Sequence, residues 1–404
     1  MVVEQAVLLV GGQGTRLRSM GFDCPKPMVE IGGRPFLEHV IRHLSRYGVR
    51  RIVLVAGYKG EMVVDRYHGK SLYDVELTVM VEPRPLGTAG ALAFAVEHLD
   101  EFFVMSNGDS LFDADLSTLL GQAMKSGSNG RLLLCEVEDA SRYGTVHVDQ
   151  DGIVQAFLEK RPNSGRQMIN SGVCLLRREA VLGANIAFPA SMEADVFPLW
   201  GASGSLEACV DEGYFIDIGL PESYGRASVE LIDAISRPAA FLDRDGVINV
   251  DNGYTHDVED LVFTPTAIDG IRALNRGGYY VVVVSNQAGV AHGYYDEAAV
   301  HRFHAAMNAE LIRHGAHIDA FYFCPYHPDA VIERYKADHS HRKPNPGMIE
   351  DAFNEWPITR AGSFLIGDRE SDVDAARNVG IPGTLVESNS CDLAAVVRSA
   401  TTGY

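Results

Sequence analysis

The sequence predicts an α/β protein with two domains, and three observations support this prediction. The chain has 404 residues, which exceeds one ordinary hydrophobic core and fits two domains of roughly 150–250 residues each. Short apolar runs alternate with helical patterns, as in mainly parallel sheets with helices on both faces. The alternation starts again at residue 239, after a short connection. We therefore expect one domain over residues 1–236 and a second over residues 237–404.

The first half contains three runs that we expect to form buried strands, at residues 6–10, 51–56 and 102–106. Apolar residues at helical spacing mark two helices between these strands, one with Phe36, Leu37, Val40, Ile41 and Leu44 and one with Leu92, Val96 and Leu99. From residue 131 to residue 176 the pattern becomes strand-rich, which predicts a partly antiparallel lid or extension. A helical run over residues 223–235 ends this half. Together these elements predict a mixed, Rossmann-like sheet.

The second half repeats the alternation of strands and helices. We expect strands at residues 239–242, 279–284, 321–323 and 364–366, which again form a Rossmann-like sheet. Sheets of this kind bind their ligands at the carboxyl ends of the strands. The candidate functional residues described below follow such strand ends.

The composition of the chain indicates which kinds of partner and which cellular compartment to expect. The chain has 54 acidic against 35 basic residues and a net charge of −19, which disfavours nucleic acid or an anionic membrane as partner. We find neither a secretory signal nor an apolar stretch of the ~20 residues that a membrane span needs. The six cysteines are scattered without framework spacing, which suits a reducing cytoplasm. We therefore expect a cytoplasmic protein that acts on small molecules, with homo-oligomerisation left open.

The first candidate site begins with the stretch Gly-Gly-Gln-Gly-Thr-Arg-Leu-Arg at residues 11–18. Glycines at the end of a strand let backbone N–H groups approach phosphate oxygens. Arg16 adds a forked cation, and Lys26 adds a point charge within a stiff Pro-Lys-Pro loop. A glycine-rich turn alone is weak evidence, but these cations at this spacing favour a phosphate site.

This combination resembles the sugar-1-phosphate nucleotidyltransferases, and the resemblance covers the expected first domain. Further matching stretches are Glu-Pro-Arg-Pro-Leu-Gly-Thr-Ala-Gly at 82–90, Asn-Gly-Asp at 107–109, Glu-Lys at 159–160, Asn-Ser-Gly at 170–172 and Phe-Ile-Asp-Ile-Gly at 215–219. The resemblance implies that Asp109 and Asp217 bind Mg²⁺. It also implies nucleotide contacts from Gly11, Gly12, Gly14, Thr15, Glu82, Gly87 and Thr88, and sugar contacts from Gly144, Glu159, Lys160 and Asn170.

The chemistry of that family explains these residue types. The oxygen of a sugar phosphate attacks the α-phosphorus of a nucleotide, and pyrophosphate leaves in line. Positioning and charge neutralisation supply most of the rate, and Mg²⁺ between two carboxylates clamps the reacting phosphate oxygens. Arg16 would hold the leaving pyrophosphate, and Lys26 would meet the attacking phosphate or the α-phosphate.

The identity of the base depends on Glu82. An anionic double acceptor suits the adjacent N1–H and amino group of guanine, whereas uracil and thymine each offer one such donor on that edge. The stretch around Glu82 also looks like that of the guanylyltransferases. We therefore expect GTP as the nucleotide; the alternative is that Glu82 is a solvated residue at the end of a strand.

The second candidate site contains four motifs. They are Asp-Arg-Asp-Gly at 243–246, Ser-Asn-Gln at 285–287, Arg-Lys-Pro at 342–344 and Gly-Asp-Arg-Glu-Ser-Asp at 367–372. Their order resembles that of the haloacid-dehalogenase-like phosphatases. The resemblance implies that Asp243 is a nucleophile that forms an acyl phosphate, and that Asp245 is its acid and base.

The same resemblance assigns the remaining residues of the second site. Asp243, the backbone carbonyl of Asp245, and Asp368 would hold Mg²⁺. The phosphoryl group would be bound by Ser285, Asn286, Arg342 and Lys343, and Asp372 would orient its neighbours.

A zinc loop is a further expectation for the second site. The motifs point to the branch that contains heptose-1,7-bisphosphate 7-phosphatases and histidinol-phosphate phosphatases, which usually has a zinc loop with two cysteines before Arg-Lys-Pro. This chain departs from that pattern, because histidines replace both cysteines and a tyrosine replaces one histidine. Zinc also accepts histidine, so we expect a tetrahedral structural Zn²⁺ site formed by Cys324, His327, His339 and His341. The alternative is that the loop has lost its metal.

The two sites together predict a bifunctional enzyme. We expect it to remove the 7-phosphate of D-glycero-D-manno-heptose 1,7-bisphosphate and to transfer GMP from GTP to the heptose 1-phosphate, giving GDP-heptose. One alternative is a transferase for mannose or another hexose 1-phosphate joined to a histidinol-phosphate-like phosphatase. A different class of alternative makes one domain a regulatory or assembly module.

Overall fold

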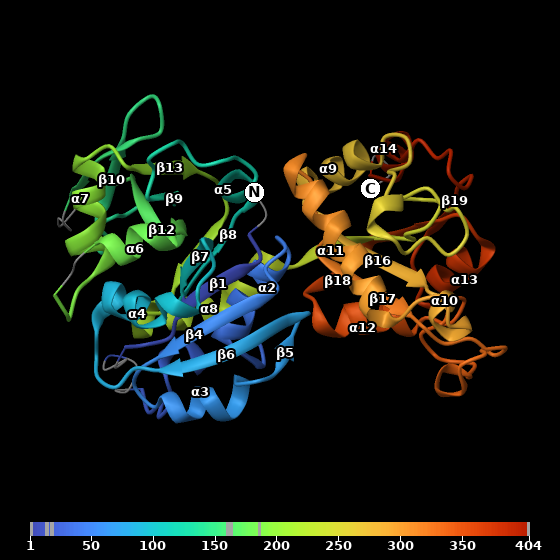
Figure 1. Cartoon of the computed structure of the whole chain (residues 1–404), viewed down its shortest axis with the longest axis horizontal. Coiled ribbons are helices and arrows are strands. Elements are labelled where there is room, and N and C mark those ends of the chain that lie inside the picture. Colours follow the sequence, from blue (N-terminus) through green and yellow to red (C-terminus); the bar gives the residue numbers. More distant parts are fainter. Residues whose placement is uncertain (1–2, 13–15, 17–19, 159–164, 185–186, 402–404) are drawn as a thin grey trace. The chain divides into compact units, whose positions relative to one another are not determined.

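The computed structural model describes residues 3–12, 16, 20–158, 165–184 and 187–401 (Figure 1). The chain divides into two compact units, residues 1–235 and 236–404. This division lies one residue before the expected boundary. No helix among the described residues combines the length and the apolar character that crossing a membrane requires.

The first unit contains a ten-stranded mixed sheet within its described residues. Its main order is β11-β10-β12-β7-β1-β4-β6-β5, with β9 beside β12 and β13 beside β9. The strands are β1 Gln5–Leu9, β4 Arg51–Ala56, β5 Ser71–Leu72, β6 Val75–Val81, β7 Phe102–Asn107, β9 Gly130–Val137, β10 Thr145–Val148, β11 Val154–Leu158, β12 Gln167–Arg177 and β13 Leu206–Val210. β1 pairs in parallel with β4 and β7, whereas β12 pairs antiparallel with β7 and β9. The strand-rich segment is therefore an extension of the main sheet.

Helices cover both faces of this sheet. They are α2 Phe36–Ser45, α3 Gly60–Tyr67, α4 Gly87–Ala95, α5 Ser117–Leu120, α6 Arg178–Gly183, α7 Phe197–Ala202 and α8 Pro221–Ile235, with short turns η1 Lys26–Met28, η2 Val96–His98 and η3 Met192–Val196. β1 is buried on both sides, because Ala6 and Leu8 join one hydrophobic core and Val7 and Leu9 join the other. The period of two along a strand explains this division.

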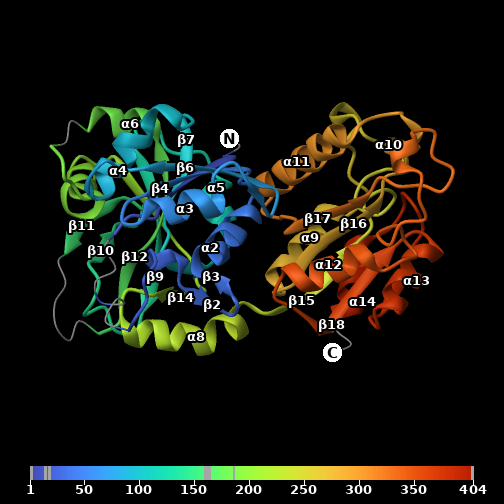
Figure 2. The same cartoon turned by 90° about the horizontal axis from the view of Figure 1, so that it is seen from below.

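Two small antiparallel ribbons complete the first unit. β2 (Glu30–Ile31) pairs with β3 (Arg34–Pro35), and β8 (Ser110–Asp113) pairs with β14 (Tyr214–Asp217). In the second ribbon Asp217 lies opposite Ser110. α8 packs beside β14 and β2 (Figure 2). The ribbon thus brings Asp217 to the end of β7, where Asp109 follows.

The second unit is built on a five-stranded parallel sheet in the order β17-β16-β15-β18-β19. Its strands are β15 Arg237–Leu242, β16 Tyr280–Asn286, β17 Ala320–Cys324, β18 Ile358–Gly367 and β19 Gly383–Leu385. The three central strands lead directly into the motifs with Asp243, Ser285 and Asp368. Parallel strands end at one edge of a sheet, so these motifs meet there.

Helices again cover both faces of the second sheet. They are α9 Ala267–Arg276, α10 Ala288–His292, α11 Glu297–Arg313, α12 Gly347–Glu355, α13 Glu370–Asn378 and α14 Leu393–Thr401, with turns η4 Val258–Asp260 and η5 Glu333–Tyr335. α9, α11 and α14 share one hydrophobic core with Ala240 and Leu242 of β15. Phe241 points to the other face, where its ring packs 5.5 Å from that of Phe353 in α12.

Candidate active sites

The first site is centred on the ammonium group of Lys26. Lys26 Nζ lies 2.5 Å from Asp109 Oδ2 and 3.8 Å from Asp217 Oδ1. Ser110 Oγ lies 3.5 Å from Asp109 Oδ1 and 3.4 Å from Asp217 Oδ2. The two carboxylates predicted to bind metal therefore converge from distant parts of the sequence. They fit Mg²⁺, which binds proteins through one or two carboxylates and completes its shell with water and substrate phosphates.

Close backbone packing holds Asp217 in this position. The N–H of Gly219 donates to Asp217 Oδ1 at 2.5 Å. A Cβ on Gly219 would lie 2.5 Å from that oxygen and 3.0 Å from Lys26 Nζ. Such distances are shorter than van der Waals contact, so only glycine leaves room for the carboxylate and the ammonium.

Glu82 directly follows β6 and lies beside the glycine-rich loop. A Cβ on Gly11 would be 3.7 Å from Glu82 Oε1, and one on Gly57 would be 3.6 Å from Glu82 Oε2. The N–H of Leu86 lies 3.4 Å from Glu82 Oε2. Burial raises the pKa of this half-buried carboxyl group, and the Leu86 N–H opposes the shift. Glu82 is thus a partly buried residue at the end of the strand, and its contact with the base stays a prediction.

Gly87 and Thr88 bind another part of the chain. Gly87 has φ +76°, and a Cβ there would lie 2.3 Å from the carbonyl oxygen of Ala190. Thr88 Oγ1 accepts a hydrogen bond of 2.8 Å from the N–H of Met192. In this structure both residues hold residues 190–192 against the start of α4, by close packing and by a hydrogen bond. The sequence did not indicate this role.

The structure describes some of the other residues that were predicted for the first site. Arg16 is described and exposed, and Gly12 has φ +118°. Thr145 pairs with Ile169 between β10 and β12, so Gly144 and Asn170 are the next opposed positions. The Asn170 amide nitrogen donates to Glu193 Oε1 at 2.9 Å. Gly14, Thr15, Glu159 and Lys160 lie outside the described residues.

The second site is centred on the buried ammonium group of Lys343. Its Nζ lies 2.7 Å from Asp243 Oδ1, 2.6 Å from Asp372 Oδ1 and 2.7 Å from the carbonyl oxygen of Val284. The contacts with Asp243 and Val284 are hydrogen bonds, and the contact with Asp372 is an ion pair. Lys343 therefore lowers the repulsion between two carboxylates that lie on either side of its charge.

Asp243, Asp368 and Asp372 form a cluster suited to a cation. Each offers a carboxylate oxygen within 4.8 Å of the others. Asp368 Oδ1 is buried and, within the described part of the chain, accepts no hydrogen bond. A buried acceptor without a donor fits a hard cation such as Mg²⁺. Burial raises the pKa of Asp243 to about 7, against the opposing effect of the Lys343 ammonium.

Asp245 is oriented by three neighbouring side chains. Arg244 donates to both of its oxygens, with Nε 3.0 Å from Oδ1 and Nη2 2.8 Å from Oδ2. Asn249 donates to Oδ1 at 3.0 Å, and Gln287 donates to Oδ2 at 2.9 Å. The Arg244 side chain is fully buried. The predicted acid and base is thus fixed in a single orientation.

A cavity of about 360 Å³ is lined by most of the predicted phosphatase residues, although not by Asp368. It is lined by Asp243, Asp245, Ser285, Asn286, Arg342 and Lys343, with Asp251, Tyr254, His292, Tyr295, His327, Arg369 and Asp372 among the others. Asn286 uses its side-chain amide to bind the backbone of Lys343, with two hydrogen bonds of 3.0 Å. It therefore positions Lys343 in addition to lining the cavity.

The expected zinc site is not formed. No three of Cys324, His327, His339 and His341 bring ligand atoms within 4.8 Å among the residues described here. The His339 ring stacks on Tyr326 at 4.1 Å, and its Nδ1 accepts from the N–H of His341. His341 Nε2 instead lies 3.0 Å from Asp351 Oδ2. In this structure these residues have other partners, so the zinc site stays a prediction.

Comparison with known proteins agrees with the division of the chain into two units that each have their own site. A nucleotidyl transferase family model matches residues 5–234, and a HAD-hydrolase-like model matches residues 340–403. The second unit is similar to D-glycero-beta-D-manno-heptose-1,7-bisphosphate 7-phosphatase of Rhodopseudomonas palustris, with 46% identity over 39% of this chain and 87% of the relative. The first is similar to D-glycero-alpha-D-manno-heptose 1-phosphate guanylyltransferase of Campylobacter jejuni, with 34% identity over 54% of this chain and 96% of the relative.

A solved structure also resembles the first unit. The crystal structure of HddC from Yersinia pseudotuberculosis is 33% identical and has a TM-score of 0.51, covering 57% of this chain and all of that one. A second structure of the same protein, with a TM-score of 0.50, is a complex with GMP-PN. This similarity supports the fold described above for the first unit.

The raised pKa of Asp243 predicts a pH-dependent affinity for Mg²⁺. Below about pH 7 a proton competes with the metal for this carboxylate, whereas above it the carboxylate is ionised. We expect the apparent Kd for Mg²⁺ to rise about tenfold for each pH unit below this value and to stay constant above it. Titration calorimetry on Asp217→Asn, which removes one carboxylate of the first site, isolates this binding. An affinity that is the same on both sides of neutrality would contradict the prediction.

Proposed function

The chain belongs to the nucleotidyl transferase family through residues 5–234 and to the HAD-hydrolase-like family through its second unit, and we propose that it is a bifunctional enzyme of GDP-heptose synthesis. The second unit would hydrolyse the 7-phosphate of D-glycero-D-manno-heptose 1,7-bisphosphate. The first would transfer GMP from GTP to the remaining 1-phosphate and release pyrophosphate. The observation that carries the proposal is that each unit has a lysine-bridged carboxylate pair and a relative named for a heptose phosphate.

Phosphate removal follows from the groups that line the cavity of the second unit. Asp243 attacks phosphorus, and the bond to the sugar oxygen breaks. Asp245 gives that oxygen a proton and afterwards takes one from the water that hydrolyses the acyl phosphate. Lys343 and Ser285 bind the phosphoryl oxygens. Asp243, Asp368 and the carbonyl of Asp245 would hold Mg²⁺, which when bound lowers the repulsion between carboxylate and phosphate.

The same cavity fits a substrate that carries a second phosphate. Arg342, Arg369 and Lys343 line this cavity. Of these three cations, Lys343 forms the ion pair with the nucleophile Asp243. Two further guanidinium groups exceed the need of a single phosphoryl group and suit a second phosphate. This supports a bisphosphate over a monophosphate such as histidinol phosphate.

Nucleotidyl transfer follows from positioning and charge. The 1-phosphate oxygen of the sugar attacks the α-phosphorus of GTP, and the bond to pyrophosphate breaks in line. Lys26 meets the reacting phosphate, and Arg16 holds the pyrophosphate as its charge develops. Asp109 and Asp217 would hold Mg²⁺, which when bound clamps the phosphate oxygens. Glu82 would accept the two N–H donors of guanine.

Separate substitutions should remove the two activities separately. We expect Asp243→Asn to abolish phosphate release and to leave pyrophosphate formation from heptose 1-phosphate unchanged. We expect Lys26→Met to lower pyrophosphate formation by about 100-fold or more and to spare phosphate release, because one charged contact to the reacting phosphate is lost.

The controls for these two variants are Asp374→Asn and Lys125→Met, whose charged groups form surface contacts with Arg377 and with the carbonyl of Asp151. Colorimetric assays of phosphate and pyrophosphate on each variant provide the measurement. Loss of both activities in Asp243→Asn would contradict independent sites.

The role of Glu82 predicts a change in base selectivity. Glu82→Gln replaces an anionic acceptor by an amide, and we expect kcat/KM for GTP to fall by about 10- to 100-fold, the value of a hydrogen bond to a charged group. Inosine triphosphate lacks the amino group of guanine, so its kcat/KM should fall less. Glu76→Gln, on the exposed side of the same strand, is the matched control. Equal losses with both nucleotides would argue against base recognition by Glu82.

A further inference from the structure

Gln287 occupies the centre of a hydrogen-bond network at the wall of the phosphatase cavity. Its Oε1 accepts from the hydroxyl of Tyr295 at 2.8 Å and from Arg244 Nη2 at 3.1 Å. Its Nε2 donates to Asp245 Oδ2 at 2.9 Å and to Ser285 Oγ at 2.7 Å. The side chain is 2% exposed. All four hydrogen-bonding positions of the amide are therefore used, and none by solvent.

The charged partners of Gln287 determine which way its amide faces. A glutamine amide has similar shape in its two flipped orientations, so only its partners distinguish them. The Arg244 guanidinium can only donate and the Asp245 carboxylate accepts, which places Oε1 toward Arg244 and Nε2 toward Asp245. The Tyr295 hydroxyl then gives Oε1 a second and shorter hydrogen bond. Without the Tyr295 hydroxyl, Oε1 would keep the longer hydrogen bond from Arg244, and the amide would be held less firmly against Asp245 and Ser285.

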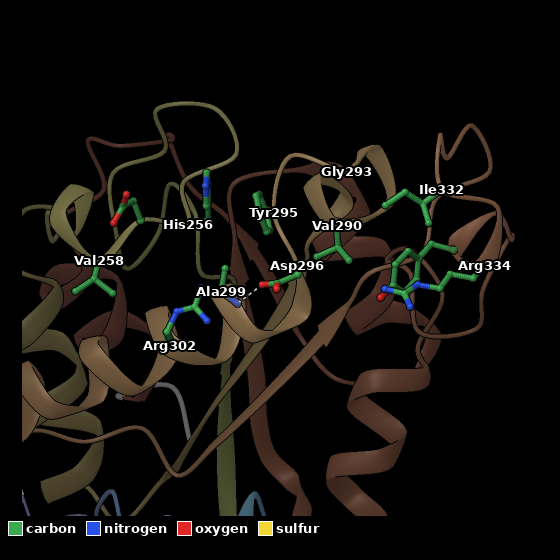
Figure 3. A pocket seen from close by; sticks show the side chains of 12 residues that line it. His256, Val258, Val290, Gly293, Tyr295, Asp296, Ala299, Arg302, Ile332 and Arg334 are labelled. Carbon is green, nitrogen blue, oxygen red and sulfur yellow. Dashed lines mark hydrogen bonds between the residues drawn. The ribbon is translucent and has the colours of Figure 1, made fainter.

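Tyr295 is itself held in place by its ring. The ring stacks on that of His256 with centroids 4.3 Å apart and planes 17° from parallel. Both residues line a second cavity of about 570 Å³, where they stand side by side (Figure 3). Burial raises the pKa of Tyr295 far above its usual value, so the hydroxyl keeps the proton that it donates.

We propose that Gln287, held in place by the Tyr295 hydroxyl, is a positioning residue that sets both Asp245 and Ser285 for phosphoryl transfer. The proposal rests on the phosphatase function proposed above. Gln287 holds one oxygen of Asp245 at the cavity wall, where the leaving sugar oxygen would need its proton. Ser285 Oγ accepts from Gln287, which leaves the hydroxyl hydrogen to donate to a phosphate oxygen.

Tyr295→Phe tests the proposal, because it removes one hydroxyl and keeps the ring that stacks on His256. Phosphate release is measured from heptose 1,7-bisphosphate, whose leaving oxygen needs a proton, and from p-nitrophenyl phosphate, whose leaving group departs without one. We expect kcat for the sugar substrate to fall about tenfold, which is smaller than the full contribution of general acid catalysis. We expect KM to change less than about threefold. The loss with p-nitrophenyl phosphate should be clearly smaller.

Gln287→Met provides a second variant of similar shape without an amide. It removes the contacts to both Asp245 and Ser285, so we expect kcat to fall on both substrates and further on the sugar. Tyr294→Phe is the matched control, because this neighbouring tyrosine is 60% exposed and lines neither cavity. Thermal unfolding of each variant shows whether the unit remains folded.

The outcomes separate this inference from the proposed function. If Tyr295→Phe has the same kcat and KM as the control Tyr294→Phe on both substrates, the positioning role is overturned. An equal loss on both substrates accompanied by a lower unfolding temperature would also overturn it, since that indicates a structural role alone. A wild-type chain that releases phosphate from neither substrate would overturn the proposed phosphatase function and this inference with it.

Discussion

Each unit holds two aspartates close together because a lysine ammonium group lies between them. Lys26 joins Asp109 to Asp217, and Lys343 joins Asp243 to Asp372. Two carboxylates about 4 Å apart would repel each other by about 4 kcal/mol at the effective dielectric of a protein surface, and more when buried. The lysine removes this cost and leaves a site that can accept phosphate and Mg²⁺. Both proposed reactions depend on this arrangement, although they share no strand or motif.

The two sites differ in burial, and the difference matches their chemistry. The Lys26 side chain is 15% exposed, whereas the Lys343 side chain is 2% exposed and contacts Asp243, Asp372 and the carbonyl oxygen of Val284. Transfer of a nucleotide needs substrates to be aligned and their charge neutralised, which an open site accomplishes. A carboxylate nucleophile benefits from a dry cavity with fixed donors, and burial accordingly raises the pKa of Asp243. The network of Arg244 and Gln287 extends this rigidity to Asp245.

Sequence patterns predicted the layout of the sheets and most partners of the second site, because strand ends and short motifs are local signals. They could not show how distant segments meet. Asp217 reaches Asp109 through the pairing of two four-residue strands, which carry no strong periodicity. The zinc prediction is unsupported for a related reason, since spacing gives the order of possible ligands but not that His339 stacks on Tyr326. Tyr295 was missed altogether, because nothing in the chain marks a loop tyrosine as the partner of Gln287.

The central claim is that one chain performs both reactions on the same sugar. The most direct measurement incubates the wild-type enzyme and Mg²⁺ with GTP and each anomer of D-glycero-D-manno-heptose 1,7-bisphosphate, and follows all products by mass spectrometry. The account predicts phosphate and pyrophosphate in equal amounts, together with a GDP-heptose that has lost its 7-phosphate. Phosphate release without any nucleotide sugar, whichever nucleoside triphosphate is supplied, would contradict it.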